Sequence, residues 1–338
     1  MMKKILILPF LLLVAIFAQA QAGVVDAHKQ AMDKAKEGNL DKALSIIKDA
    51  EITYPNNLSL LKDEAFINTW KKDYANAIEA GKKLVDNAEA DEQCFQILGS
   101  AYRADSKYEA AEKVYQAGIE KFPQNSLLYA EYGDALKQNG KMAAAKVAWE
   151  KGIELNPSIS SNYYFLTKFY SEHKNPLWSV IYGEMFANIE SFSNRTTEIR
   201  SIVMNQYTAL FAAPNILQEY ITNGQPFEKA VAGTLAQFQD MVSGGVTPES
   251  LYALRGQFIV NWFNGDNAKN FPFKLFDRQQ QLLKLGIFEA YNQWMFASYN
   301  QSQFNSWGHM HDGLIKEFSK FQKASMFKVP KGEYYAHN

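Results

Sequence analysis

The hydrophobic pattern of the chain predicts helices, and in the N-terminal half this pattern repeats every 34 residues. In the clearest copy, residues 98–125, the small residues Gly99, Ala111 and Gly118 stand among larger apolar side chains, and Pro123 follows. Three further copies fill the same places, so that four frames begin at residues 24, 58, 92 and 126 without insertions. A fixed period of this length is typical of stacked repeats, in which each unit buries its apolar face against the next.

The spacing predicts two antiparallel helices in each frame, A and then B, which cross at their small residues. Gly99 lies on helix A and Ala111 on helix B, so the two helix axes can approach closely and their larger neighbours interdigitate. Gly38 and Gly140 stand in the A–B turn, where a positive backbone angle favours glycine. Helix B is ended by prolines, which cannot continue a helix, at Pro55, Pro123 and Pro157.

This unit resembles the tetratricopeptide repeat (TPR) family in its length, its small residues, its large apolar residues and its final proline. Frames 92–125 and 126–159 match closely, whereas frames 24–57 and 58–91 each lack part of the pattern. A fifth frame, 160–193, is interrupted by Pro176 and Phe186, and we interpret it as a divergent repeat or a capping helix pair. The resemblance implies an all-α, right-handed α-solenoid over residues 24–193.

Beyond residue 193 the 34-residue period fades, although the helical pattern continues. Thr247, Pro248 and Glu249 together form a helix start signal. An amphipathic stripe is formed by Phe227, Val231, Leu235, Phe238 and Val242. We predict a distinct helical domain over 194–338 whose family the sequence does not identify. The alternative is a set of degenerate repeats that continue the solenoid.

The first twenty residues predict a signal peptide. Lys3 and Lys4 precede an apolar run from Ile5 to Phe17, and the stretch 18–20 has the small-x-small pattern of a cleavage site. An N-terminal membrane anchor is the alternative, but the run is short for a transmembrane span. We therefore expect cleavage after Ala20 and an exported product, periplasmic or secreted, with no stable membrane anchor.

Charge and motif content narrow the function classes. The net charge is -1, so no global field favours binding to nucleic acid or to an anionic membrane. Cys94 is the only cysteine, which rules out an intrachain disulfide, and its predicted place on a buried helix face indicates a core thiol. The sequence has no P-loop, dinucleotide fingerprint, G-x-S-x-G or H-E-x-x-H motif. We expect no cofactor and no catalysis.

The TPR resemblance implies a peptide-binding groove lined by the A helices. Transferred by place in the repeat, the candidate residues are Lys62, Phe66, Trp70, Gln96, Ser100, Arg103, Asp134 and Lys137. Basic and aromatic residues together suit an extended peptide with acidic or aromatic anchors. Trp70 is the strongest candidate because tryptophan is enriched at binding hot spots. For each residue the alternative is ordinary solvation or packing. We predict an exported TPR scaffold that binds a protein or a peptide.

A second hypothesis is a glycan-binding or glycan-processing protein that uses its aromatic C-terminal half. Aromatic residues flank an Asn/Gly-rich loop at Trp262, Phe263, Phe271 and Phe273. Flat rings above polar amides suit sugars, and the alternative is that these rings fill a core.

A third hypothesis is a metal-dependent enzyme that uses His309 and His311. In an extended strand these two side chains face the same way and can ligate a metal, whereas in a helix they diverge. Because an apolar helical stripe follows, Asp312 is expected to be the N-cap of a helix that begins at Gly313 or Leu314.

Overall fold

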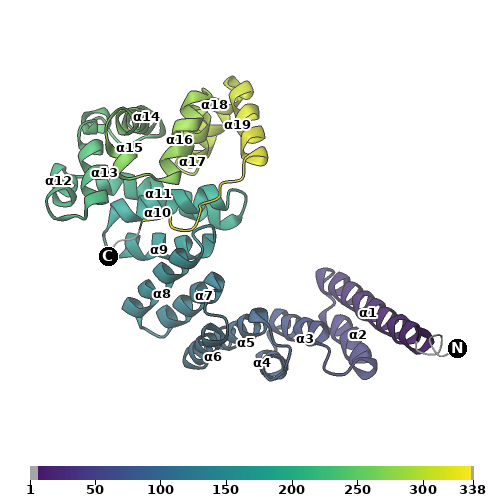
Figure 1. Ribbon diagram of the computed structural model, residues 1–338. Coiled ribbons are helices and arrows are strands. Elements are labelled where there is room, and N and C mark those ends of the chain that lie inside the picture. The colour runs from purple at the N-terminus through teal and green to yellow at the C-terminus, as the bar shows by residue number, and fades with distance from the viewer. Residues whose placement is uncertain (1–6, 336–338) are drawn as a thin grey trace. The chain divides into compact units, whose positions relative to one another are not determined.

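The computed structural model describes residues 7–335, with side chains from residue 21 onward except that of Pro214. Helices are the only regular secondary structure in this part of the chain, as the sequence predicts (Figure 1). Two compact units, Met1–Ala145 (unit 1) and Lys146–Asn338 (unit 2), divide the chain inside one helix. The predicted signal peptide begins with residues outside the described range, and no side chain within it is described, so it stays a prediction.

Unit 1 consists of alternating A and B helices. The A helices are α1 (Ile7–Lys36), α3 (Leu58–Lys71), α5 (Glu92–Ala104) and α7 (Ser126–Gln138). The B helices are α2 (Leu40–Thr53), α4 (Tyr74–Val85), α6 (Tyr108–Lys121) and α8 (Met142–Leu155), the last of which contains the division between the units. Successive A helices contact one another, α1 with α3, α3 with α5 and α5 with α7, and form one layer of the unit.

The helix starts keep the predicted period. From α3 onward each A helix begins 34 residues after the previous one, and from α2 onward so does each B helix. The register extends to α9 (Ser160–Glu172) and α10 (Pro176–Ile189), which form the fifth helix pair. Pro176 occupies the first turn of α10, where a proline is tolerated. The chain therefore contains TPR-like repeats.

Two local signals recur at the same places in the repeats. The side chains of Asn57, Asp91 and Asn125 each accept a hydrogen bond from a backbone N–H of the first turn of α3, α5 and α7. In the A–B turns a left-handed residue recurs every 34 positions. Its φ is +82° at Gly38 and +76° at Gly140, as predicted, and the non-glycine turns have 64° at Lys72, 57° at Ser106 and 53° at Lys174.

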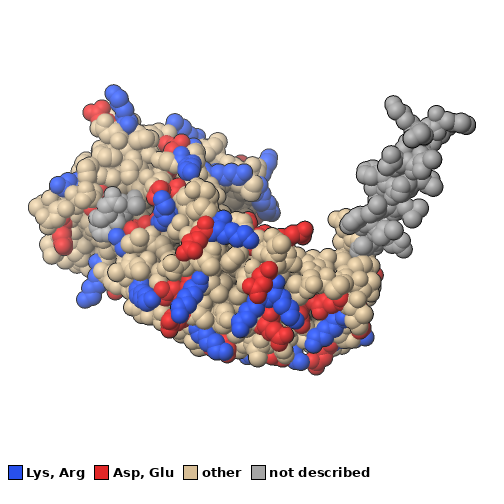
Figure 2. Space-filling view, turned by 60° about the horizontal axis from the view of Figure 1, so that its bottom comes forward, with Lys and Arg blue, Asp and Glu red and all other residues tan. Residues whose placement is uncertain are grey.

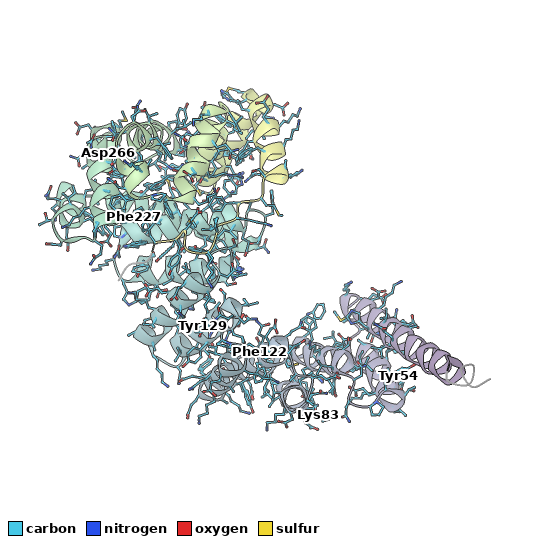
Figure 3. All side chains as sticks on the ribbon, viewed as in Figure 1. Tyr54, Lys83, Phe122, Tyr129, Phe227 and Asp266 are labelled. Carbon is cyan, nitrogen blue, oxygen red and sulfur yellow. The ribbon has the colours of Figure 1, made fainter. Side chains whose placement is uncertain are left out.

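The small residues lie where the helices cross. Ala31, Ala65 and Ala111 are fully buried, and a Cβ placed on Gly118 would stand 2.9 Å from the Cβ of Phe95. The C-caps of α2 and α6 are aromatic, and each directly precedes a predicted helix-ending proline (Tyr54 and Phe122, Figure 3). The predicted crossing of A and B helices at small residues is therefore observed.

Unit 2 surrounds α10, in which every residue from Pro176 to Asn188 is buried. A helix with no polar face is typical of a protein core. Helix α10 packs between α9 and α11. The remaining elements are α11 (Asn194–Leu210), α12 (Pro214–Asn223), α13 (Pro226–Ala236), η1 (Gln239–Val242), α14 (Pro248–Asn264), α15 (Asn267–Asn270), α16 (Lys274–Lys284), α17 (Phe288–Phe296), α18 (Gln301–Met310) and α19 (Asp312–Ala324). The sequence places a domain boundary after residue 193, and this boundary stays a prediction.

Two helix predictions in this unit have different outcomes. Thr247 caps α14 as predicted, and its side chain accepts a hydrogen bond from the backbone of Ser250. The stripe that begins at Phe227 does not form one helix. It is divided between α13 and η1, because Phe238 N donates to Leu235 O and tightens the chain into a 3₁₀ turn.

A tail of residues 325–335 follows α19 and packs against unit 2. Val329 is buried, its N–H donates to Ser158 Oγ at 2.9 Å, and its carbonyl accepts from the same hydroxyl at 3.0 Å. Further along, the Tyr335 ring stacks on Phe227 with ring centroids 3.9 Å apart. The tail is therefore part of the packing of this unit.

Candidate functional site

Two aromatic side chains stand on the outer face of α3. The Phe66 and Trp70 side chains are 50% and 48% exposed, and their rings meet edge to face with centroids 5.7 Å apart. The remaining faces of α3 bury Leu60, Ala65 and Ile67, so the packing of the helix leaves the two rings toward solvent. Large exposed rings in contact are typical of interaction sites. We call Phe66 and Trp70 the aromatic pair.

The charged candidate on the same helix is engaged within the protein. Lys62 Nζ lies 2.6 Å from Asp91 Oδ2 and 3.0 Å from Gln93 Oε1, so the lysine joins α3 to the start of α5. Next to it, His28 Nδ1 lies 2.8 Å from Asp63 Oδ2 and joins α1 to α3. Burial raises the pKa of Asp63, and the bond from His28 opposes this shift. These contacts position the A helices and leave little free charge for a ligand.

A second network engages the candidates on α5 and α7. Arg103 donates to Glu131 Oε2 at 2.5 Å and also to Asp134 Oδ2. Tyr115 OH lies 3.3 Å from both Ser100 Oγ and Glu131 Oε2. Burial raises the pKa of the Glu131 carboxyl, although the charge of Arg103 lowers it. Two predicted groove residues, Arg103 and Asp134, therefore join neighbouring repeats, and a third, Ser100, contacts Tyr115 within its own repeat. Gln96 and Lys137 are half-buried on the same two helices.

No single sign of charge dominates the face of the molecule that Figure 2 shows. Figure 2 shows basic and acidic side chains interspersed over the face in view. Near the aromatic pair, Lys71 Nζ lies 2.6 Å from Asp41 Oδ1. Many of the charged side chains thus already form ion pairs within the chain, whose net charge is -1. The two rings of the aromatic pair, by contrast, remain half-exposed.

The structure does not place the predicted metal ligands together. His309 is exposed on α18, whereas the His311 ring stacks on Trp307 and its Nδ1 lies 2.9 Å from Trp307 O. Among the described residues no group of three His, Cys, Asp or Glu side chains is arranged to hold a metal. The N-cap of α19 is His311, not Asp312 as predicted, because the helix begins one residue earlier. Asp312 instead pairs with Lys316 at 2.5 Å.

The aromatic residues of the glycan hypothesis lie mainly in a core. Trp262 and Phe273 are buried, and both pack on Phe227 and Phe276. Rings covered on both faces offer no platform for a sugar.

In unit 1, Cys94 is buried as predicted, and its thiol donates to Asp91 Oδ1. Burial raises the pKa of this thiol to about 11, so it is not a nucleophile at neutral pH.

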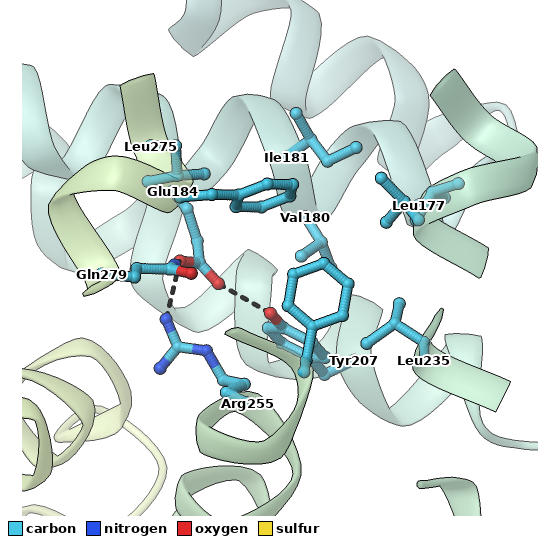
Figure 4. Close-up of a pocket in the computed structure, with 12 residues that line it drawn as sticks. Leu177, Val180, Ile181, Glu184, Tyr207, Leu235, Arg255, Leu275 and Gln279 are labelled. Carbon is cyan, nitrogen blue, oxygen red and sulfur yellow. Dashed lines mark hydrogen bonds and ion pairs between the residues drawn. The ribbon is translucent and has the colours of Figure 1, made fainter. Parts of the chain in front are cut away.

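A buried ionic network lies at the centre of unit 2 (Figure 4). The Glu184 carboxylate accepts hydrogen bonds from Arg255 Nη2 at 2.7 Å, Gln279 Nε2 at 2.6 Å, Tyr207 OH at 2.7 Å and Tyr291 OH at 3.2 Å. Sequence reasoning missed this network, because it joins α10, α11, α14, α16 and α17.

The cavity beside this network is too small for a substrate. Its volume is about 30 Å³, and its lining is mostly aliphatic and aromatic. This space admits one or two water molecules. All four hydrogen bonds that the Glu184 carboxylate accepts come from within the fold. We interpret the network as a structural feature that fixes the packing of five helices.

No family model matches the chain, and no curated protein matches it. Solved structures with similar folds include MamA, which is 24% identical with a TM-score of 0.41, over 48% of this chain and 94% of MamA. A TPR protein of Thermus thermophilus is 16% identical with a TM-score of 0.45, over 55% of this chain and 98% of that protein. PilF of Pseudomonas aeruginosa is 16% identical with a TM-score of 0.48, over 62% of this chain and 96% of PilF. The TPR-like repeats rest on the helix register described above.

Proposed function

We propose that unit 1 is a non-catalytic scaffold that binds a protein or peptide segment through the aromatic pair. The observation that carries the proposal is that Phe66 and Trp70 remain half-exposed and in contact on a helix whose other face is fully packed. Tryptophan anchors in rigid helical surfaces are among the residues whose truncation costs most in protein interfaces.

The internal ion pairs narrow the class of ligand. Lys62 and Arg103 both have carboxylate partners within the chain, so an acidic ligand residue would have to compete with Asp91 or Glu131. The sequence alone allows acidic or aromatic anchors. The contacts favour a segment that presents an apolar or aromatic side chain to the aromatic pair, with hydrogen bonds at its rim.

A peptide-library selection on immobilised chain tests the proposal. Selected peptides are expected to contain a recurrent apolar or aromatic residue. Trp70→Ala and Phe66→Ala are each expected to weaken binding by about 30-fold or more, which is the effect of losing a hot spot of about 2 kcal/mol. Phe192→Ala is the matched control, because Phe192 is also exposed but lies in unit 2. Selection of no peptide, or equal affinity in all variants, would count against the aromatic pair.

We further propose that the protein acts after export, as its leader indicates. Among the described residues no helix has both the length and the apolar character needed to cross a membrane. N-terminal sequencing of the product from an expressing cell is expected to begin at Gln21. An uncleaved product in the cell interior would contradict the export proposal and leave the binding proposal intact.

A further inference from the structure

A large open cleft lies within unit 2, far along the sequence from the aromatic pair. Its volume is about 730 Å³, within the range of roughly 300–1,000 Å³ that is typical of small-molecule sites. The cleft is formed by the α9–α10 turn, the last turns of α11, helix α12 and the start of α13. No motif in the sequence indicates this cleft, because its lining residues are scattered over separate segments between residues 171 and 228.

The phenol of Tyr220 is held in a fixed position at this cleft. Its hydroxyl donates to Asn175 Oδ1 at 2.7 Å and accepts from the backbone N–H of Leu177 at 3.4 Å. Burial raises the pKa of Tyr220 to about 12, so the hydroxyl is neutral at physiological pH. The ring and the amide of Asn175 are therefore preorganised before a ligand arrives.

Three further polar groups are fixed with hydrogen-bonding capacity remaining. Gln206 Nε2 donates to Ser171 Oγ at 2.9 Å, which leaves the Gln206 carbonyl oxygen as an acceptor and the Ser171 hydroxyl as a donor. The His173 ring stacks on Phe169 with centroids 4.1 Å apart, and its Nδ1 lies 2.7 Å from Phe169 O. Its Nε2 is consequently the free ring nitrogen at the cleft.

The charges at the cleft sum to about -1, from one lysine (Lys174) against two glutamates (Glu219 and Glu228). Lys174 and Glu219 are both exposed lining residues, and they contribute one charge of each sign. The buried carboxylate of Glu228 is bound by Trp178 Nε1 and by the backbone N–H of Gln225, so it is occupied within the fold. An apolar wall completes the cleft at Ala209, Ala212 and Ile216.

We propose that this cleft binds an uncharged, hydroxyl-rich ligand, a neutral mono- or disaccharide. Amide, imidazole and hydroxyl groups both donate and accept, as sugar hydroxyls do, and the apolar wall suits the C–H face of a sugar ring. A strongly charged ligand would meet a lining whose net charge is only -1, with the second carboxylate, Glu228, already hydrogen-bonded within the fold. The site is independent of the aromatic pair, and it differs from the buried rings around Trp262.

Ligand-observed NMR on the full chain tests the proposal with glucose, galactose, maltose and lactose as probes. At least one of these sugars is expected to bind. Ala212→Trp is expected to abolish binding because the new ring fills the cleft from an exposed position, where it does not disturb the core. Gln206→Leu is expected to lower the affinity about 3- to 10-fold through the loss of one hydrogen bond.

Matched variants separate the cleft from the rest of the molecule. Gln218→Leu is the control for Gln206→Leu, because Gln218 lies outside the cleft lining and donates to Thr222. Gln218→Leu and Trp70→Ala are expected to leave sugar binding unchanged. The proposal is overturned if no sugar binds, or if binding survives Ala212→Trp in a chain with unaltered circular dichroism. It is also overturned if the zwitterion glycylglycine binds in the cleft and the sugars do not.

Discussion

Gly99→Ala is expected to destabilise unit 1, even though alanine is the better helix former. Gly99 lies inside α5, and a Cβ built on it would stand 2.5 Å from Cε1 and 2.8 Å from Cε2 of Tyr115. The Tyr115 ring is fully buried, and its hydroxyl contacts Ser100 and Glu131. The ring has no room to move away, so helices α5 and α6 must separate.

Two opposing terms set the magnitude. Replacing glycine by alanine in a helix interior stabilises the helix by about 1 kcal/mol. Overpacking a closed contact costs about 1–3 kcal/mol, and the anchored Tyr115 hydroxyl places this case in the upper part of that range. We therefore expect a net loss of about 1–2 kcal/mol. For a unit of this size the melting temperature falls by about 2–8 °C.

Thermal and urea denaturation followed by circular dichroism measure the effect, with Gly256→Ala as the matched control. Gly256 lies inside α14, and a Cβ built on it would meet no atom within 4 Å. The control is therefore expected to gain about 1 kcal/mol from helix propensity alone. If both variants were stabilised equally, the close crossing of α5 and α6 at Gly99 would be refuted.

Four other substitutions probe buried groups. Burial raises the pKa of Glu131 above its ordinary value of 4.5, so the free energy of unfolding of the wild type is expected to fall as the pH rises from 4.5 through the raised pKa. Glu131→Gln is expected to remove this pH dependence, as measured by urea denaturation at several pH values. An unchanged pH dependence in the variant would contradict the prediction. Glu184→Gln is expected to cost about 3–5 kcal/mol, because the Arg255 guanidinium is left buried without a counter-charge. Adding Arg255→Met is expected to recover part of that loss, and a further loss in the double variant would argue against this cause. Val231→Ile is expected to gain up to about 0.8 kcal/mol by filling the small cavity, whereas a lower melting temperature would show that the cavity has no room.

The repeat architecture could be predicted because its determinants are local. Each helix pair depends on small residues, caps and turn residues at fixed spacing, and α5 and α6 begin where frame 92–125 places them. The positive φ at Lys72, Ser106 and Lys174 was not predictable from residue type, since only glycine signals that conformation clearly. There the register of the repeats overrides the local preference.

The engaged state of the candidate residues could not be predicted from one frame. Lys62 and Arg103 bind partners about thirty residues away: Asp91, which caps the next A helix, and Glu131, which lies on the A helix of the next repeat. Which side chain faces which depends on how the repeats stack, and a place in a family pattern does not determine this. The Glu184 network and the cleft at Tyr220 depend on longer-range packing still, for which the sequence carries no periodic signal.

The bond between Ser158 and Val329 gives the two units different folding behaviour. In the described part of unit 1, side-chain hydrogen bonds such as Arg103–Glu131 and His28–Asp63 join residues 28 and 35 positions apart. In unit 2 the Ser158–Val329 contact spans 171 positions. Folding slows as contacts become less local. During synthesis, unit 1 is therefore expected to fold first, whereas unit 2 is expected to complete its packing only after Val329 has been synthesised. A ribosome that stops short of Val329 would release a folded repeat array attached to an unfinished core.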